Sequence, residues 1–322
     1  MTKAVVKYLR GGGGGMRNTR ILKNRLIKTF IEQRSLWVIA LPGIVWYAIF
    51  AYGPMGGLLM AFENYSPVRG LFGGPWVGFK WFIQFFQSQF AWRLIRNTLL
   101  ISICSIIFSF PVPIILAIML NEIRFPGYKR FAQTVSYLPH FISTVIVVGM
   151  MANFLAPDGL INNFISMLGG QRRQFMALPQ WFRFLYISSG IWQNAGWNSI
   201  IYLAAIAGIN AELYEAATVD GASRFRQIFC VTLPCILPTI VILLIMSVGN
   251  LLSVGYEKII LMYNTATYET ADVINTYVYR RGIGGGEFSF GAAVGMLQSV
   301  VNMIVIVSAN TISRKISETS LW

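Results

Sequence analysis

The chain has 322 residues, of which 55% are hydrophobic and only 12% are charged, and its formal net charge is +14. Soluble domains usually carry about 25% charged residues. So few charged side chains cannot give a chain of this length a polar surface, which excludes an ordinary soluble globular protein, and we expect the lipid bilayer to be its solvent.

The first 35 residues form a basic, glycine-rich tail. It holds nine lysines and arginines against one acid, Glu32, and it contains the run Gly11 to Gly15. The glycines predict a flexible linker rather than a phosphate loop, because no Lys-Ser/Thr pair follows them. The positive charge predicts a cytoplasmic N-terminus. A cleaved signal peptide is not expected, because the first apolar run is too long and starts too late.

Six apolar runs follow, and each is long enough to cross about 30 Å of hydrocarbon as a helix of about 20 residues. We expect transmembrane helices at 36–61, 97–120, 132–155, 184–207, 235–256 and 290–312. They lack the alternation of a membrane barrel, so we predict an all-α polytopic fold. Residues 36–322 then form one transmembrane domain with its core at about 90–312. Prolines predict kinks at Pro42, Pro54, Pro111, Pro113, Pro139 and Pro238.

The charge distribution orients these helices. A cytoplasmic N-terminus and six spans predict a cytoplasmic C-terminus, with 121–131, 208–234 and 313–322 inside. The connections outside are 62–96, 156–183 and 257–289. The net charge of +14 divides into +10 inside and +4 outside. The inner excess fits the anionic inner leaflet and argues against a nucleic-acid partner. The outer excess either has no functional meaning or favours an anionic solute.

The predicted spans lack the side chains that drive transport or catalysis. Ion-coupled transporters place charged groups within their helices, and these spans contain essentially none. No cluster of Asp, Glu, His or Cys indicates an active site or a metal. The stretch GGPWVGFK (73–80) departs from a phosphate loop at Phe79. We therefore expect no enzyme activity and no bound cofactor, and if the protein moves a solute uphill, a partner must supply the energy. We interpret His140 as a packing or interfacial residue, with a place in a transport pathway as the alternative.

The connection at 208–234 interrupts this apolar pattern with the stretch EAATVDGASRFRQIFCVTLP (215–234). Gly221 permits a left-handed turn, which predicts a short helix on each side of it. On the second helix an apolar stripe is predicted, consisting of Ala222, Phe225, Ile228 and Phe229. The element suits docking in a groove of a partner, and an amphipathic loop lying on the membrane is the alternative.

This stretch resembles the EAA loop of permease subunits of type I ABC importers. The pattern is filled by Glu215, Ala216, Ala217, Gly221, Val231, Leu233 and Pro234. In that family the loop, here 209–234, forms coupling helices that sit in a cleft of an ATPase subunit. The resemblance assigns ATPase coupling to Glu215, Ala216, Ala217, Asp220, Gly221, Ala222 and Phe225.

Further stretches resemble the LplB-type branch, which imports oligosaccharides, and look most similar to permeases for alginate oligosaccharides. They are WVGFKWF (76–82), YLPHFIST (137–144), GIWQNAGWNSIIYLAAIAGIN (190–210), ILMYNTATYETADVINTYVYRRGI (260–283) and ISETSLW (316–322).

The resemblance implies a MetI-like permease fold in the lipid of the bacterial cytoplasmic (inner) membrane. It implies a second homologous permease, two ATPase subunits that bind ATP and Mg, and a solute-binding protein that delivers the sugar for import by alternating access. A permease for a neutral oligosaccharide or another small solute is the alternative. A membrane enzyme acting on lipid-linked sugars is a more distant one.

Sugars are bound by hydrogen-bonding groups set against aromatic faces. On that basis the candidates for the substrate path are Asn153, Trp192, Gln193, Asn194, Trp197, Asn198 and Asn250, with Tyr256 and Glu257 at the outer end of the fifth span. The alternative is that these side chains bond helices to one another or form an interfacial belt. Residues 62–96 and 257–289 are both candidate surfaces for the binding protein.

Overall fold

The computed structural model describes residues 34–316, 320 and 321. Most of the tail at 1–35 and of the ending at 316–322 therefore lies outside the described residues. Within them the chain is helical, and its one extended pairing is an isolated antiparallel bridge between Glu63 and Trp76. The predicted all-α class is confirmed. The chain divides into two units, Met1–Leu58 and Leu59–Trp322.

The described part of the first unit is an apolar helix. α3 (Arg34–Tyr47) continues into a π-helical turn (Ala48–Tyr52) and a 3₁₀ segment (Gly53–Phe62), whose last residues belong to the second unit. Pro42 lies inside α3 without ending it. Together these segments form 29 residues that are apolar enough to span a membrane. The first predicted span is confirmed.

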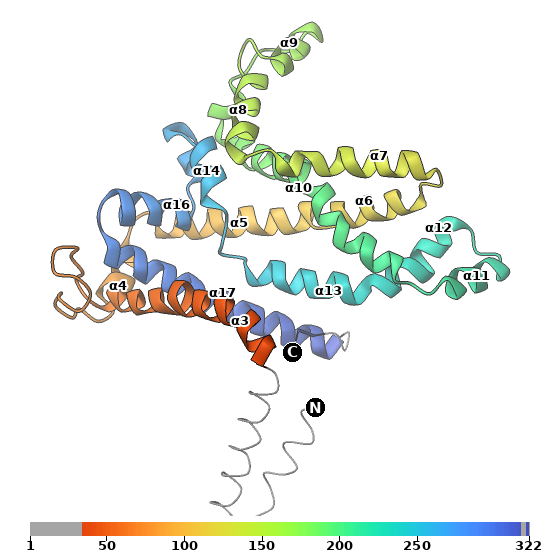
Figure 1. Cartoon of the computed structure of the whole chain (residues 1–322). Coiled ribbons are helices and arrows are strands. Elements are labelled where there is room, and N and C mark those ends of the chain that lie inside the picture. The colour runs from red at the N-terminus through yellow and green to blue at the C-terminus, as the bar shows by residue number, and fades with distance from the viewer. Residues whose placement is uncertain (1–33, 317–319, 322) are drawn as a thin grey trace, which may run out of the picture. The chain divides into compact units, whose positions relative to one another are not determined.

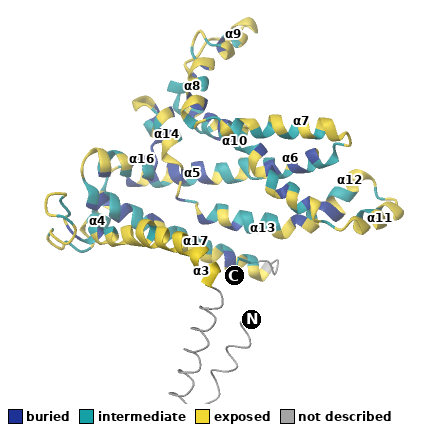
Figure 2. Ribbon diagram, in the orientation of Figure 1, coloured by how far each residue is buried: buried dark blue, intermediate teal, exposed yellow. Residues whose placement is uncertain are grey.

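Long helices build the second unit (Figure 1). α5 (Ala91–Ser109) continues into α6 (Pro111–Glu122), since Pro111 occupies the first turn of α6, where its missing N–H costs nothing. α12 (Arg224–Gln227) continues through a π-helical turn (Ile228–Thr232) into α13 (Leu233–Gly249). α10 (Pro179–Ala207) and α17 (Phe288–Ile316) complete the set, and α10 packs against α5, α6 and α13. Figure 2 shows buried residues along α5 and α10, whereas α7, α11 and α12 have none.

The third predicted span is wrong as a continuous helix over 132–155. α7 (Pro126–Tyr137) is followed by a 3₁₀ turn (Leu138–Phe141), and α8 (Thr144–Phe154) then leaves at 95° to the preceding helix. Pro139 has no N–H to continue α7, and Ser143 caps the new helix by accepting from the Ile146 N–H. The described residues hold four helices that could span a membrane, or six if each bent pair is one span.

The fifth predicted span ends earlier than expected. α13 stops at Gly249, and the segment that follows is tied to α17. There the Leu252 N–H donates to Asn302 Oδ1, and Gln298 Nε2 donates to the Leu252 carbonyl. The expectation that Tyr256 and Glu257 end the fifth span is therefore wrong, because they begin a separate helix, α14 (Tyr256–Met262).

Short helices fill the end of the unit where α5 begins: α4 (Lys80–Gln87), α15 (Tyr268–Ala271) and α16 (Ile274–Val278). Asp272, between α15 and α16, is fully buried. Its carboxylate pairs with Arg280 at 2.9 Å and Arg93 at 3.6 Å and accepts from the Thr276 hydroxyl. A buried acid needs such partners. The cluster joins α5 to the segment around α16, and α5 consequently starts at Ala91 rather than at residue 97.

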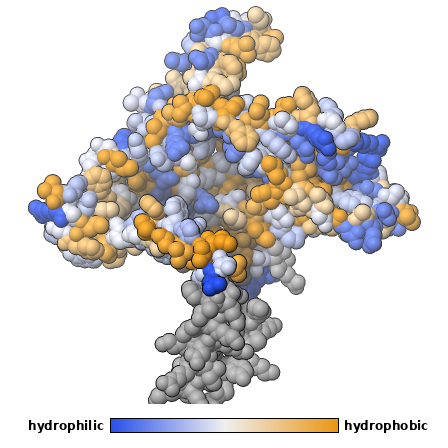
Figure 3. All heavy atoms as spheres, in the orientation of Figure 1, coloured by the Kyte–Doolittle hydropathy of each residue, from blue (hydrophilic) through white to orange (hydrophobic). Residues whose placement is uncertain are grey.

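The connections at 121–131 and 208–234 lie at the same end of the second unit, where α7 begins and where α11 (Ala211–Val219) and α12 lie (Figure 1). An ion pair of 3.5 Å between Arg224 of α12 and Glu122 of α6 joins them. Figure 3 shows hydrophilic residues gathered there. Their shared end agrees with the predicted placement of both connections on one side of the membrane.

Candidate functional site

The EAA stretch folds as two helices divided by a glycine. α11 ends at Val219, and Gly221 adopts a left-handed conformation with φ of +72°. Ser223 then caps α12 by accepting from the Arg226 N–H. The predicted division at Gly221 is confirmed. Ala222 precedes this cap, so its predicted place on the apolar stripe of the second helix is wrong.

Side-chain hydrogen bonds hold the two helices as one unit. Gln227 Nε2 donates to Thr218 Oγ1 at 3.0 Å and to the Ala222 carbonyl at 3.1 Å. The hydroxyls of Tyr214 and Thr232 lie 2.9 Å apart, which joins α11 to the turn before α13. A displacement of α11 therefore carries α12 with it.

This helix pair presents an apolar surface at a polar end of the molecule. Phe225 is 72% exposed and Phe229 56% exposed, and their ring centroids lie 5.0 Å apart. Glu215, Ala216 and Asp220 are exposed as well. Exposed aromatic side chains of this kind indicate contact with a protein partner or with the membrane surface, because either contact removes them from water. We call Phe225, Phe229 and the exposed face of α11 the coupling surface.

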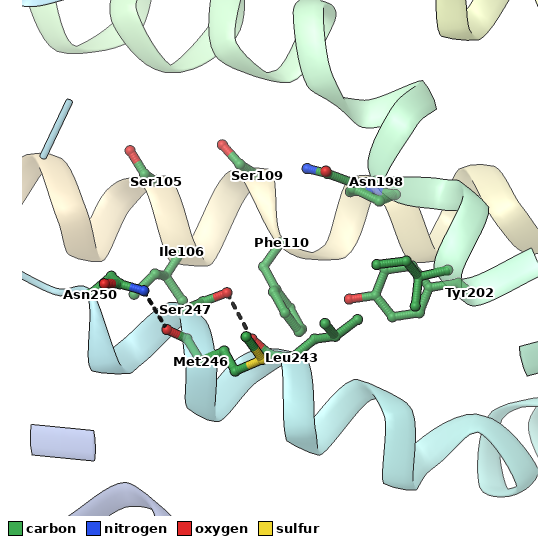
Figure 4. Close-up of a pocket in the computed structure, with 12 residues that line it drawn as sticks. Ser105, Ile106, Ser109, Phe110, Asn198, Tyr202, Leu243, Met246, Ser247 and Asn250 are labelled. Atoms are coloured by element: carbon green, nitrogen blue, oxygen red, sulfur yellow. Dashed lines mark hydrogen bonds between the residues drawn. The ribbon is translucent and has the colours of Figure 1, made fainter. Parts of the chain in front are cut away.

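A cavity of about 380 Å³, lined by apolar side chains as well as by hydroxyl and amide groups, lies between α5, α10 and α13 (Figure 4). Figure 4 shows Ser105 and Ser109 on one side of α5, pointing toward α10, while Ile106 and Phe110 point toward α13. The cavity brings together two of the predicted path residues, Asn198 of α10 and Asn250, which caps α13. Asn250 Nδ2 donates to the Met246 carbonyl, which leaves its amide oxygen available to a ligand.

A second cavity, of about 670 Å³, shares Ser105, Ser109 and Asn198 with the first. We call the two together the polar cavity. The second part adds the predicted residues Gln193 and Asn194 and, from the break before α8, His140. The His140 ring stacks on Trp197 with centroids 4.6 Å apart, and its Nδ1 lies 3.1 Å from Asn194 Oδ1. His140 therefore packs against an aromatic ring and also lines the cavity.

Sequence reasoning missed Lys258, a cation that lines the same cavity. Its Nζ donates to the Tyr186 carbonyl at 3.2 Å and lies 5.2 Å from the centre of the Tyr186 ring. Burial lowers the pKa of Lys258 to about 8. In the described part of the chain, no ion pair joins Lys258 to a carboxylate. The sequence gives no direct signal of this position, because Lys258 follows the fifth span and only the return of α14 onto α10 brings it to the cavity.

The remaining predicted path residues lie elsewhere. Trp192 lines a separate apolar cavity of about 460 Å³ between α8, α9 (Leu160–Met167) and α10. Asn153 is exposed on α8, Tyr256 stacks on Tyr279, and Glu257 is exposed, all outside the polar cavity. Hydroxyl groups that sequence reasoning passed over line the polar cavity instead: Ser105, Ser109, Tyr186, Tyr202 and Ser247. The spacing of four between Ser105 and Ser109 is the one signal that places two of them on one helix face.

Known proteins resemble this chain over almost its whole length. Residues 109–318 match the family model of the "Binding-protein-dependent transport system inner membrane component". The polygalacturonan/rhamnogalacturonan transport system permease protein YteP of Bacillus subtilis is 42% identical over 93% of this chain and 94% of its own. Protein LplB of the same organism is 43% identical over 90% of this chain and 92% of its own.

Two solved structures share the fold. One chain of a bacterial alginate ABC transporter, in complex with an alginate pentasaccharide-bound periplasmic protein, superposes with a TM-score of 0.85. It is 47% identical and covers 92% of this chain and 100% of that chain. A second structure, of a bacterial ABC transporter that imports the acidic polysaccharide alginate, gives a TM-score of 0.84 at 48% identity, over 91% of this chain and 99% of that chain. The chain therefore belongs to the family of binding-protein-dependent transport system inner membrane components, the multi-pass permease subunits of ABC importers, alongside LplB and YteP.

Proposed function

We propose that this chain is one of two paired permeases in an ATP-driven importer of acidic oligosaccharides of the alginate type. The observation that carries the proposal is the polar cavity between α5, α10 and α13. Its hydroxyl and amide groups, among them Ser105, Asn194 and Asn198, suit sugar hydroxyls, and its lining includes the aromatic rings of Phe110 and Phe141. Its lining includes the cation Lys258 and no carboxylate.

The comparisons support the acidic sugar. Both structural relatives belong to alginate transporters, and one of them is described as importing an acidic polysaccharide. YteP is named for polygalacturonan and rhamnogalacturonan. An anionic substrate would also benefit from the outer net charge of +4 deduced from the sequence, because a positive entrance raises its local concentration.

The energy source in this proposal is a pair of ATPase subunits that bind the coupling surface on α11 and α12. They hold the ATP and Mg, while this chain carries out no catalysis. Closure of the ATPases moves α11 and α12, and alternating access follows as the polar cavity opens in turn to each side of the cytoplasmic membrane. A solute-binding protein delivers the sugar from outside, and both chain termini lie in the cytoplasm.

Reconstitution of the complete transporter tests the substrate. The permease pair, the ATPases and the binding protein are placed in lipid vesicles, and uptake is measured with acidic and neutral oligosaccharides of equal length. We expect ATP-dependent uptake of the acidic oligosaccharide in preference to the neutral one. Uptake of the neutral sugar alone, or of neither sugar, contradicts the proposal and favours a permease for a neutral oligosaccharide or another small solute.

The coupling surface is tested by Phe225→Asp. A carboxylate in place of this exposed ring cannot be buried against the ATPase without a large desolvation penalty, so we expect co-purification of the ATPase to fall by about tenfold or more. Phe72→Asp is the matched control, because Phe72 is 73% exposed against 72% for Phe225 but lies in the predicted outer connection. Equal co-purification with both variants argues against this docking surface.

A further inference from the structure

The polar cavity contains a positive charge that no acid among the described residues pairs with. The groups that line it are hydroxyls, amides and apolar side chains, together with His140 and Lys258. Aspartate and glutamate are absent from this lining. The Asp272 cluster shows the contrast, since there the buried carboxylate holds Arg280 at 2.9 Å and Arg93 at 3.6 Å.

The ammonium of Lys258 has more hydrogen-bond donors than the one that reaches Tyr186. It carries three donors, and one of them reaches the Tyr186 carbonyl at 3.2 Å. Partial burial of an ammonium without a carboxylate is unfavourable, and it becomes favourable only when an anion or several acceptors satisfy the remaining donors. The nearby ring of Tyr186 compensates for part of the charge but does not replace an anion.

His140 offers a second polar atom to the same space. Asn194 Nδ2 donates to the Gly190 carbonyl at 3.1 Å, so the amide oxygen of Asn194 faces His140 Nδ1. This oxygen accepts a hydrogen bond from the Nδ1–H of His140. Nε2 is then the ring nitrogen left to accept a hydrogen bond from a sugar hydroxyl. Stacking on Trp197 fixes the plane of the ring.

We propose that Lys258 binds a carboxylate of the substrate in the polar cavity and thereby makes this permease selective for acidic sugars. The Nζ donates to one carboxylate oxygen of a uronate unit. Asn198, Ser105 and Ser109, which line both parts of the cavity, hold hydroxyls of the same or the next unit, with His140 beside them. The inference rests on the proposed function and adds to it the residue that distinguishes an acidic sugar from a neutral one.

A purely structural lysine is the competing explanation. In that case the bond to Tyr186 would serve to fasten α14 to α10, and a substitution would weaken the subunit whatever the substrate. Two variants separate the alternatives. Lys258→Met removes the charge and keeps an unbranched side chain that is one heavy atom shorter, whereas Lys258→Arg keeps a positive charge and N–H donors.

The experiment uses the complete transporter in lipid vesicles with acidic and neutral oligosaccharides of equal length. We expect Lys258→Met to reduce uptake of the acidic oligosaccharide by about tenfold, as loss of a charge-assisted bond predicts, and Lys258→Arg to retain most of it. The amount of assembled complex should match wild type in both variants. Any uptake of the neutral oligosaccharide should be unchanged.

The pH profile gives a second readout. Because the pKa of Lys258 is lowered to about 8, the free side chain is charged below this pH and loses its proton as the pH rises through it. Uptake by wild type, divided by uptake by Lys258→Arg at the same pH, should therefore fall about tenfold between roughly pH 7 and 9. The titratable groups that line the cavity with Lys258 are His140 and Tyr186 of α10. The variant retains both, so the ratio isolates Lys258.

Each outcome decides the matter. Acidic uptake at the wild-type level in Lys258→Met overturns the inference while leaving the proposed function intact. Equal loss in both variants with less assembled complex identifies a structural lysine and overturns it as well. If wild type itself imports only neutral sugar, the proposed function fails and the inference fails with it.

Discussion

Replacement of Gly221 by valine is expected to abolish most ATP-driven uptake while leaving the subunit in the membrane. Gly221 has φ of +72°, and a β-branched residue in this left-handed region costs about 1–2 kcal/mol or more. A Cβ there would meet nothing within 4 Å, so the penalty comes from the backbone alone. The turn relieves it by changing conformation, which alters the angle between α11 and α12 and removes the coupling surface from its position. We expect uptake to fall by more than about tenfold.

Gly221→Asn is the matched control, because asparagine tolerates the left-handed conformation better than other non-glycine residues. It should retain most of the uptake. Membrane content of the subunit and ATP hydrolysis by the assembled complex are measured beside uptake. Gly221→Arg, and deletion of 215–221, should also leave the subunit in the membrane and uncouple hydrolysis from transport. Normal uptake by the valine or the arginine variant would show that α11 and α12 do not transmit the work of ATP hydrolysis.

Gly196→Ala is expected to destabilise the subunit strongly, although it adds only one methyl group. Gly196 lies on α10 where this helix crosses α7, and a Cβ would overlap the backbone carbonyl of Ser136. A backbone group cannot turn aside as a side chain can, so the helices must separate, at a cost of about 3 kcal/mol or more. Helix pairs in membranes depend on such small residues for close approach.

Gly190→Ala, on the same helix, is the control. Its Cβ would lie 3.7 Å from Lys258 Nζ, an ordinary contact, and alanine favours the helix by about 1 kcal/mol relative to glycine. Thermal aggregation of the purified complex should therefore begin at a lower temperature for Gly196→Ala and at an unchanged or higher one for Gly190→Ala. The same onset for both variants would contradict the close crossing at Ser136.

Hydropathy predicted the helices whose environment is lipid. The first, second and sixth predicted spans agree with the structure, and most of their ends lie within a few residues of the observed helix ends. The length of each apolar run alone is enough to predict such a span. The third failed, since hydropathy cannot measure a bend. Pro139 gave a correct signal for a kink, yet the turn from α7 to α8 reaches 95° through the 3₁₀ segment and the Ser143 cap.

The two helices of the EAA stretch were predictable because they depend on local sequence. Gly221, the Ser223 cap and the helix on either side depend on residues a few positions apart. The polar cavity depends on contacts between distant segments. Asn198 and Asn250 were recognised from their type, whereas Lys258 was missed, because its position results from α14 folding back onto Tyr186, 72 residues away in the chain. Tyr256 and Glu257 precede Lys258 by only two residues and one residue, yet Tyr256 stacks on Tyr279 and Glu257 is exposed.

Phe225 and Phe229 of the coupling surface share one continuous helical segment with part of the cavity wall. This segment, α12 with the π-helical turn and α13, has 26 residues from Arg224 to Gly249 and is about 39 Å long, with Phe225 near one end and Ser247 near the other. Because the helical backbone continues through the π-helical turn, we expect a displacement at either end to reach the other. If an ATPase binds at Phe225 and a sugar at Ser247, as proposed, thermodynamic reciprocity requires each to change the affinity for the other by the same factor. A change in sugar affinity on ATPase binding would thus make an occupied cavity a signal to the subunits that hydrolyse ATP.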